Sequence, residues 1–179
     1  MNTAGLSLSD APPFGRIYPF FIASAIFGAL SFAALSLAQT IDRYDPYVIA
    51  SIHLFTIGFL VNAAFGALSQ MLPVVGGVKI ESPKIIRIAQ IGISIGAVLF
   101  FAGFVFYRPI LFAAVAILSF SLLSGFGMLL VKIQTNSQLT SQTVKVVRFA
   151  QIISLVAFAI GGHLLYSQAT TNISGTHLR

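Results

Sequence analysis

The chain has 179 residues, of which 57% are hydrophobic and only 8% are charged, and its mean hydropathy is +0.95. Soluble domains of this length are far less apolar, so the composition predicts helices embedded in a membrane. Cysteine is absent, which excludes disulfides, thiolate metal sites, iron–sulfur clusters and covalently attached heme.

Five apolar segments are long enough to cross a bilayer, which takes about 20 helical residues. They cover residues 20–38, 48–72, 85–107, 109–131 and 146–166, and a polar tail follows at 167–179. Ser36-Leu37-Ala38 resembles a signal-peptide cleavage site, but the apolar stretch before it is longer than in signal peptides, so we expect a retained helix. Because the connections are short, neighbouring segments should be antiparallel. The sequence predicts one all-α integral membrane domain, a five-helix transmembrane bundle.

The net charge of +6 is spread thinly over the connections, which argues against a nucleic-acid surface. If the N-terminus is inside, seven basic residues are cytoplasmic: Arg16, Lys79, Lys84, Arg87, Lys132, Lys145 and Arg148. Three lie on the opposite side: Arg43, Arg108 and Arg179. Because cytoplasmic loops carry the excess of basic residues, this bias predicts an N-in, C-out protein. We expect a multi-pass protein of the bacterial inner (cytoplasmic) membrane.

Two histidines lie at matching depths in the second and fifth segments. His53 is a few residues into the second segment, and His163 is a few residues before the end of the fifth. Both should therefore lie just below the outer surface. An imidazole within a bilayer is costly and usually has a partner or a function. Taken singly, each ring fits a headgroup-level position or a bond to a neighbouring carbonyl slightly better, but for the pair at one depth we expect the two rings to share one heme iron.

Segments two–three and four–five are similar to each other. Residues 84–91 read KIIRIAQI and residues 145–152 read KVVRFAQI, with five identities in eight positions. This similarity predicts a parallel tandem repeat of helix hairpins. The repeat gives Ala114 as the equivalent of His53 and Ala102 as the equivalent of His163. Each half then supplies one histidine, which favours a single site between the hairpins.

Other residues fit a heme near the outer face. Its propionates would meet side chains of the outer connections, namely Arg43, Arg108, Tyr44 and Tyr47. Phe55, Phe59 and Phe158 are candidates for packing on the porphyrin, with ordinary core or lipid contact as the alternative. Five helices leave little protein around a macrocycle, so we expect a homodimer, with the heme held in one chain or at the subunit interface. Small residues at Gly92, Gly96 and Gly103 are candidate dimer contacts.

Residues 53–73, which read HLFTIGFLVNAAFGALSQMLP, carry a family resemblance. This run resembles the second transmembrane helix of heme-copper oxidase subunit I and its small single-domain relatives. The resemblance implies that His53 ligates a low-spin heme b, and that Phe65-Gly66 and Pro73 belong to the segment that follows the ligand. In that family the second ligand comes from a late helix, which makes His163 the counterpart by role. The other segments match only as apolar spans.

The chain departs from a complete oxidase, because its three histidines are too few for a copper centre beside the hemes. It is therefore not expected to reduce oxygen alone, and a redox role stays open. Our leading hypothesis is a cytochrome b-like protein with one bis-histidine heme near the periplasmic side, in electron transfer or in heme or gas sensing, served by a redox partner or a quinone. The alternatives are a cofactor-free accessory or assembly protein of a respiratory complex, and a small-solute or metal transporter.

Overall fold

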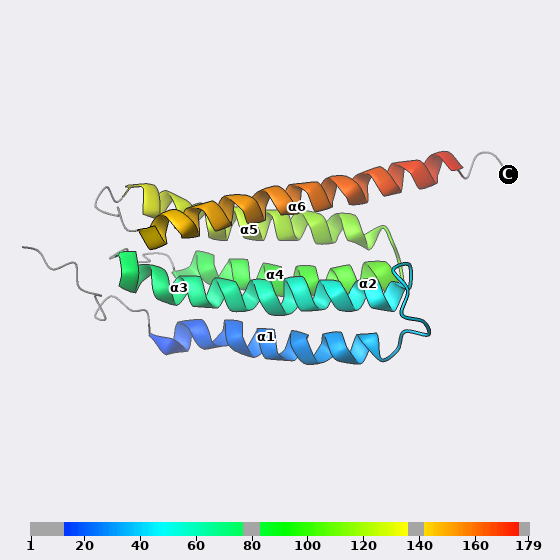
Figure 1. Ribbon diagram of the computed structural model, residues 1–179, viewed down its shortest axis with the longest axis horizontal. Coiled ribbons are helices and arrows are strands. Elements are labelled where there is room, and N and C mark those ends of the chain that lie inside the picture. Colours follow the sequence, from blue (N-terminus) through cyan, green and yellow to red (C-terminus); the bar gives the residue numbers. More distant parts are fainter. Residues whose placement is uncertain (1–12, 77–82, 136–141, 176–179) are drawn as a thin grey trace, which may run out of the picture.

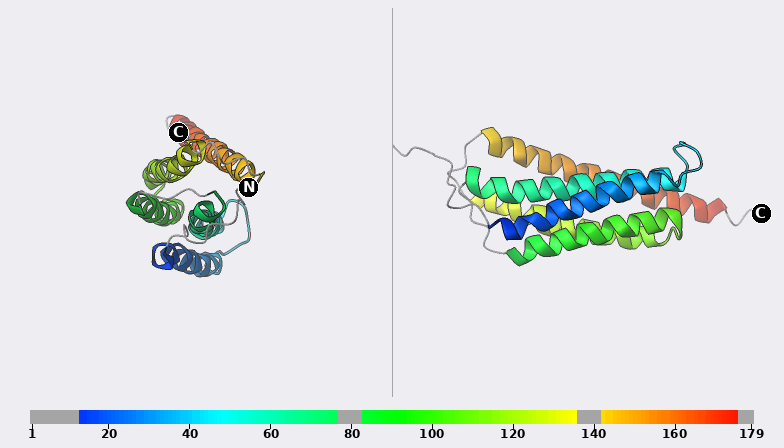
Figure 2. Two further views of the ribbon diagram at one scale, coloured as in Figure 1. Left: turned by 90° about the vertical axis from the view of Figure 1, so that its left-hand side faces the viewer. Right: turned by 90° about the horizontal axis from the view of Figure 1, so that it is seen from below.

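The computed structural model describes residues 13–76, 83–135 and 142–175, and all the regular elements within these ranges are helices. Five helical rods run side by side and alternate in direction, so the first rod begins at one end of the bundle and the last rod ends at the other (Figures 1 and 2). The expected all-α architecture of five apolar helices agrees with this arrangement. The tandem repeat and the orientation in the membrane stay predictions.

The first rod, α1 (Phe14–Leu35), begins six residues before the expected segment and continues through Pro19. Pro13 precedes its first turn, where a missing backbone N–H costs nothing. The last rod, α6 (Gln142–Gly175), also differs from the prediction, because it continues through most of the expected polar tail. No proline or glycine stands between His163 and Gly175, so nothing interrupts the helix before that glycine. Residues 176–179 lie outside the described part.

The second rod is continuous but not uniform. It consists of α2 (Pro46–His53), a π-helical segment η2 (Leu54–Val61) and α3 (Asn62–Gly76). The Asp45 side chain accepts hydrogen bonds from the backbone N–H groups of Tyr47 (2.8 Å) and Val48 (3.3 Å), and Pro46 occupies the first helical position. These are strong helix-start signals. Because α2 begins at Pro46, His53 lies about two helical turns inside that end of the bundle.

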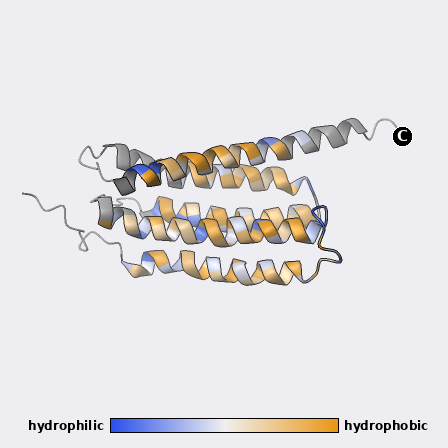
Figure 3. Cartoon of the chain, in the orientation of Figure 1, coloured by the Kyte–Doolittle hydropathy of each residue, from blue (hydrophilic) through white to orange (hydrophobic). Residues whose placement is uncertain are grey.

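Within the described residues, three stretches are long and apolar enough to cross a membrane: Phe14–Leu35, Pro46–Met71 and Lys84–Val105. Two shorter apolar stretches, Ile110–Gly125 and Arg148–Leu164, belong to α5 (Ile110–Thr135) and α6. Apolar residues predominate in the coloured parts of the rods (Figure 3). Many large apolar side chains are exposed, among them Phe32 at 66% and Phe120 at 66%. Such a surface is typical of helices that face lipid.

Glycines set how closely the rods approach. A Cβ at Gly58 would lie 2.6 Å from the Phe27 ring of α1, and one at Gly66 would lie 2.8 Å from Phe20 Cβ. Phe20 also stacks on Phe65, with ring centroids 5.8 Å apart. These glycines therefore receive the phenylalanines of α1. The second rod and α1 therefore pack closely, because the phenylalanine side chains of α1 fill the space left by the glycines of the second rod.

The glycines of α4 (Pro83–Val105) correct one prediction. Gly92, Gly96 and Gly103 are buried, and a Cβ at these positions would clash with Ser121, Leu118 and Leu111 of α5, respectively. They therefore form the close α4–α5 contact within one chain and are not dimer contacts. The spacing of these glycines alone could not distinguish packing within one chain from packing between two chains, because small residues allow close approach to any helix.

Among the described residues, the last rod contacts the fewest other helices. It makes its main contacts with α5, whereas α2, η2 and α3 pack on both α1 and α4. The view along the rods shows α6 at one edge of the bundle (Figure 2). As a result, α6 stands apart from α2 and η2, and the pocket described below lies between them.

Candidate functional site

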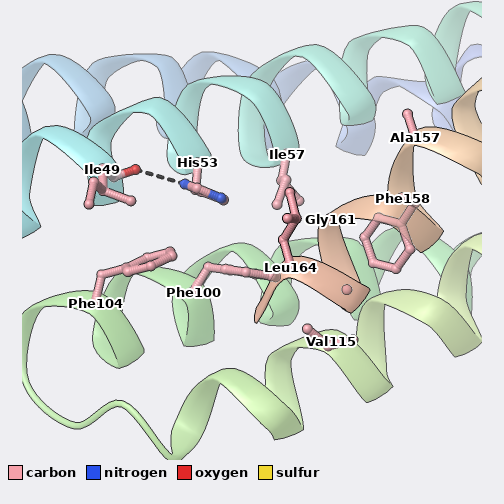
Figure 4. A pocket seen from close by; sticks show the side chains of 11 residues that line it. Ile49, His53, Ile57, Phe100, Phe104, Val115, Ala157, Phe158, Gly161 and Leu164 are labelled. Atoms are coloured by element: carbon pink, nitrogen blue, oxygen red, sulfur yellow. Dashed lines mark hydrogen bonds between the residues drawn. The ribbon is translucent and has the colours of Figure 1, made fainter. Parts of the chain in front are cut away.

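A pocket of about 340 Å³ lies among four helices towards the end of the bundle that carries the α1–α2 connection. Its walls come from the second rod (Ile49, His53, Ile57), from α4 and α5 (Phe100, Phe104, Val115) and from α6 (Ala157, Phe158, Gly161, Gly162, Leu164). Figure 4 shows these side chains around the space. All of them are apolar except His53, so the pocket presents a single side chain able to bind a metal or accept a proton.

The His53 ring is held in one orientation. Its Nδ1 lies 2.8 Å from the backbone carbonyl oxygen of Ile49, one turn earlier (Figure 4). A carbonyl only accepts, so Nδ1 donates the hydrogen and the neutral ring keeps its lone pair on Nε2. Metal-binding histidines use this same arrangement, in which a backbone carbonyl fixes the tautomer and orients the free nitrogen.

Two phenylalanines of α4 fix the plane of the ring. Phe100 stacks on His53 with centroids 5.1 Å apart and planes 14° apart, and the Phe104 centroid lies 4.8 Å away. Their spacing of four residues places both on one face of α4. The imidazole is thus clamped on its face and at Nδ1, while the edge that bears Nε2 remains for a ligand.

The pocket wall opposite His53 is formed by α6, is apolar, and has no side chain at two of its positions. Gly161 and Gly162 bring the α6 backbone to the pocket, and a Cβ at Gly161 would meet nothing within 4 Å. Phe158 lies on the same wall, one turn earlier. The absence of side chains at two successive positions leaves space beside the imidazole that suits a flat, apolar molecule.

The two predicted ligands do not share this pocket. His163 follows Gly161 and Gly162, so it lies at the level of His53, as the sequence predicts. Its side chain is exposed, however, and it is not part of the pocket wall. On a helix of 3.6 residues per turn, position 163 lies opposite the mean direction of the pocket-lining positions of α6. One chain therefore offers the pocket one histidine.

The expected propionate partners lie at the right end of the bundle but outside the pocket wall. Arg43 and Tyr44 stand in the α1–α2 connection, where the Arg43 guanidinium carbon is 4.7 Å from the Tyr44 ring centroid. Tyr47 is half-buried in the first turn of α2, and Arg108 is exposed between α4 and α5. All four are near the mouth of the bundle without contacting the space beside His53.

The three candidate aromatic residues separate into two groups. Phe158 lines the pocket. Phe55 and Phe59 pack on each other, with centroids 5.0 Å apart, and turn towards α1, where Phe55 meets Phe32 and Phe59 approaches Gly28. The π-helical segment that contains both residues thus contributes Ile57 to the pocket and its phenylalanines to α1.

The donor set fits heme better than a free metal ion. Within residues 13–76, 83–135 and 142–175, no three His, Cys, Asp or Glu side chains come together to bind a metal. A lone imidazole is sufficient for heme, because the porphyrin supplies the equatorial nitrogens and the protein adds an axial ligand. The pocket supplies one such imidazole, His53, within apolar and aromatic walls.

Comparison of the chain with protein-family models, with characterised proteins and with solved structures found no match. The likeness of residues 53–73 to an oxidase helix therefore remains a resemblance of one segment.

Sequence reasoning missed the clamp on His53. Phe100 and Phe104 were not predicted as site residues, although their spacing of four places them on one face of the neighbouring antiparallel span. Their distance from the end of that span also matches the depth of His53. The π-helical segment that begins directly after His53 has no comparable signal, because its residues are ordinary formers of an apolar helix.

Proposed function

We propose that the chain is a heme-binding, cytochrome b-like protein of the bacterial inner membrane, in which His53 is an axial ligand of one b-type heme. The observation that supports the proposal is the state of this ring, with Nδ1 bonded to the Ile49 carbonyl and Nε2 directed into an apolar pocket. A heme there would supply electron transfer or the binding of a small axial ligand.

The chain's own residues have separable roles in this proposal. His53 would hold the iron, and the Ile49 carbonyl orients the His53 ring. Phe100 and Phe104 fix the imidazole plane and exclude water, since burial removes the competing ligand that water would provide. Gly161 and Gly162 leave room for the macrocycle.

The proposal revises the expected bis-histidine ligation. In the geometry of one chain, His163 is directed away from the pocket, so the ligand that this chain supplies to its own pocket is His53 alone. A heme held by His53 alone would be able to bind a small molecule as well. This coordination favours the gas- or heme-sensing form of the hypothesis over a purely electron-transferring one.

The deciding experiment is an absorption spectrum of the purified protein saturated with heme. We expect a Soret band in the wild type, loss of most of this band in His53→Ala, and retention of it in His163→Ala, which is the matched control. Loss of the band in both variants would instead support bis-histidine ligation. Full binding by His53→Ala, or none by the wild type, would overturn the proposal and favour the accessory or transporter alternatives.

A further inference from the structure

The second rod carries a polar side chain in the middle of its apolar length. Asn62 is completely buried at the end of η2, and its Nδ2 donates to the backbone carbonyl oxygen of Gly58 at 2.8 Å. The backbone N–H of Asn62 bonds instead to the carbonyl of Phe59. The Gly58 carbonyl therefore accepts from the side chain of residue 62, where an ordinary α-helix would use the backbone N–H of that residue.

This bond fixes the direction of the other polar atom of the Asn62 amide. Because a carbonyl only accepts, the amide nitrogen must face Gly58 and the amide oxygen, Oδ1, must face away from it. Within the described residues, Oδ1 is buried and has no hydrogen-bond partner. Such an atom is costly, and most buried polar atoms in proteins meet a protein group or ordered water.

A second buried oxygen of the same kind belongs to Ser94 of α4. Two buried serines of neighbouring helices donate to the backbone carbonyl one turn earlier, Ser24 to Phe20 (2.8 Å) and Ser121 to Ile117 (2.7 Å). The Ser94 hydroxyl makes no such bond, and its oxygen is buried without a hydrogen-bond partner in the described part of the chain. Both its hydrogen and its lone pairs are therefore available to a ligand.

The two oxygens lie at nearly one level of the bundle. Phe65 and Ala89 are level with each other, because both would meet a Cβ at Gly125 of α5. The second rod and α4 run antiparallel, so Asn62, three residues before Phe65, is level with the residue three places after Ala89. Ser94 is two residues further along α4, which is a rise of about 3 Å.

The Ser94 side chain also faces the junction of α4 with α1 and the second rod. Ala97 and Phe101 of α4 pack there with Phe27 of α1 and Leu54 of the second rod. Ser94 lies three and seven residues before the two α4 residues, so it is on the same face of the helix. The second rod packs on both α1 and α4, so its completely buried side chain at this level lies in the same junction.

The chemistry of the two oxygens suits a neutral ligand. The amide oxygen accepts and the hydroxyl donates or accepts, so a molecule that donates to the first and bonds to the second satisfies both. Buried water occupies such positions in folded proteins when it has two or more polar partners. A cation would lack a counter-charge, because none of the acidic residues lies in a described helix.

From these observations we propose that a buried water molecule bridges Asn62 Oδ1 and the Ser94 hydroxyl at the junction of the second rod, α4 and α1. Because Asn62 also bonds to the Gly58 carbonyl, this water links α4 to the end of the π-helical segment. Neither residue lines the pocket at His53, so the site is separate from the candidate heme site and does not depend on heme binding.

A crystal structure at a resolution that shows ordered water tests the site directly. We expect a water molecule within hydrogen-bonding distance of both Asn62 Oδ1 and Ser94 Oγ. A direct hydrogen bond between the two side chains, or apolar contacts around Oδ1 with no water beside it, overturns the proposal.

A double-mutant cycle in detergent tests whether the two side chains are coupled. Ser94→Val and Ser94→Thr have the same shape, and differ in that a methyl group replaces the hydroxyl. We expect the folding equilibrium constant of Ser94→Val to be about 3- to 10-fold lower than that of Ser94→Thr, the contribution of one hydrogen bond. In an Asn62→Leu background the two should agree within about 2-fold, because the water has lost its other partner. An equal gap in both backgrounds overturns the proposal.

Ser121→Ala is the matched control for this cycle. Ser121 lies at the same level, beside Gly92 of α4, but its hydroxyl bonds to the Ile117 carbonyl. We expect Asn62→Leu to leave the effect of Ser121→Ala on the folding equilibrium constant unchanged. A change as large as the one at Ser94 contradicts a bridge that is specific to Asn62 and Ser94.

Discussion

At the residue scale, the position of His53 depends on short-range contacts that come from different parts of the chain. The Ile49 carbonyl lies one turn earlier on the same helix, whereas Phe100 and Phe104 come from α4. The sequence alone indicates the histidine and its depth, because an imidazole in an apolar span stands out. It does not indicate the side of α6 on which His163 lies. That side depends on which face of α6 packs against α5. A helix turns by about 100° per residue, so assigning the packed face two residues too early or too late places a side chain on the opposite side.

The cap of α2 gives one residue-scale prediction. Asp45 accepts two backbone N–H groups at the start of the helix that carries His53. We expect Asp45→Ala to lower the free energy of unfolding by about 1 kcal/mol, the usual contribution of an N-cap. Asp45→Asn, which keeps the acceptor oxygen, should stay within a few tenths of a kcal/mol of the wild type. Thermal unfolding in detergent measures both variants, and equal losses would contradict a capping role.

The open wall of the pocket gives a second prediction. A side chain at Gly161 would extend into free space, since nothing lies within 4 Å of its Cβ position. We therefore expect Gly161→Phe to fold normally but to lose most of its heme uptake, because the ring would occupy the space beside His53. Ile153→Phe, on an exposed side of the same helix, is the control and should bind heme normally. Normal heme uptake by Gly161→Phe would place the heme elsewhere.

At the scale of helices, the apolar segments were predictable but their contacts were not. The lengths and order follow from hydropathy, because a span must match the bilayer. The partner of each glycine does not follow, since Gly58 and Gly92 look alike in sequence yet receive side chains of α1 and α5. The extension of α6 to Gly175 was missed because its polar residues were taken as a tail, although no helix breaker precedes that glycine.

The fit between Gly58 and Phe27 gives a prediction at this scale. A methyl group at Gly58 would overlap the Phe27 ring, so we expect Gly58→Ala to destabilise the protein by about 1–3 kcal/mol through overpacking. Combining it with Phe27→Ala should cost less than the sum of the two single changes. Gly127→Ala, where nothing lies within 4 Å, is the control and should be neutral or slightly stabilising. Melting temperatures of the four variants show whether the effect of Gly58→Ala comes from overlap with the Phe27 ring or only from the change in helix propensity.

At the scale of the whole molecule, the alternation of five rods brings two connections to one end of the bundle. The α1–α2 and α4–α5 connections both lie at the end nearer to His53 (Figure 1). The bias of basic residues predicts that this end faces away from the cytoplasm. The candidate heme pocket would then lie near the periplasmic face.

Surface labelling tests this orientation. We expect Ile41→Cys, in the 92% exposed position of the α1–α2 connection, to react in intact spheroplasts with a maleimide that cannot cross membranes. Lys145→Cys, near the start of α6, should react only after the membrane is opened. The reverse pattern would show that the chain is inserted with its N-terminus outside.

The π-helical segment η2 lies between the part of the second rod that carries His53 and the part that packs Gly66 against α1. Its wider turns change the angular phase between residues before and after it, which separates the direction of His53 from that of Gly66. If the same eight residues wound as an ordinary α-helix, the two ends of the rod would be out of step, so that it could keep either the imidazole against Phe100 or the glycine against Phe20, but not both. The winding of this stretch is therefore constrained more tightly than its apolar composition suggests.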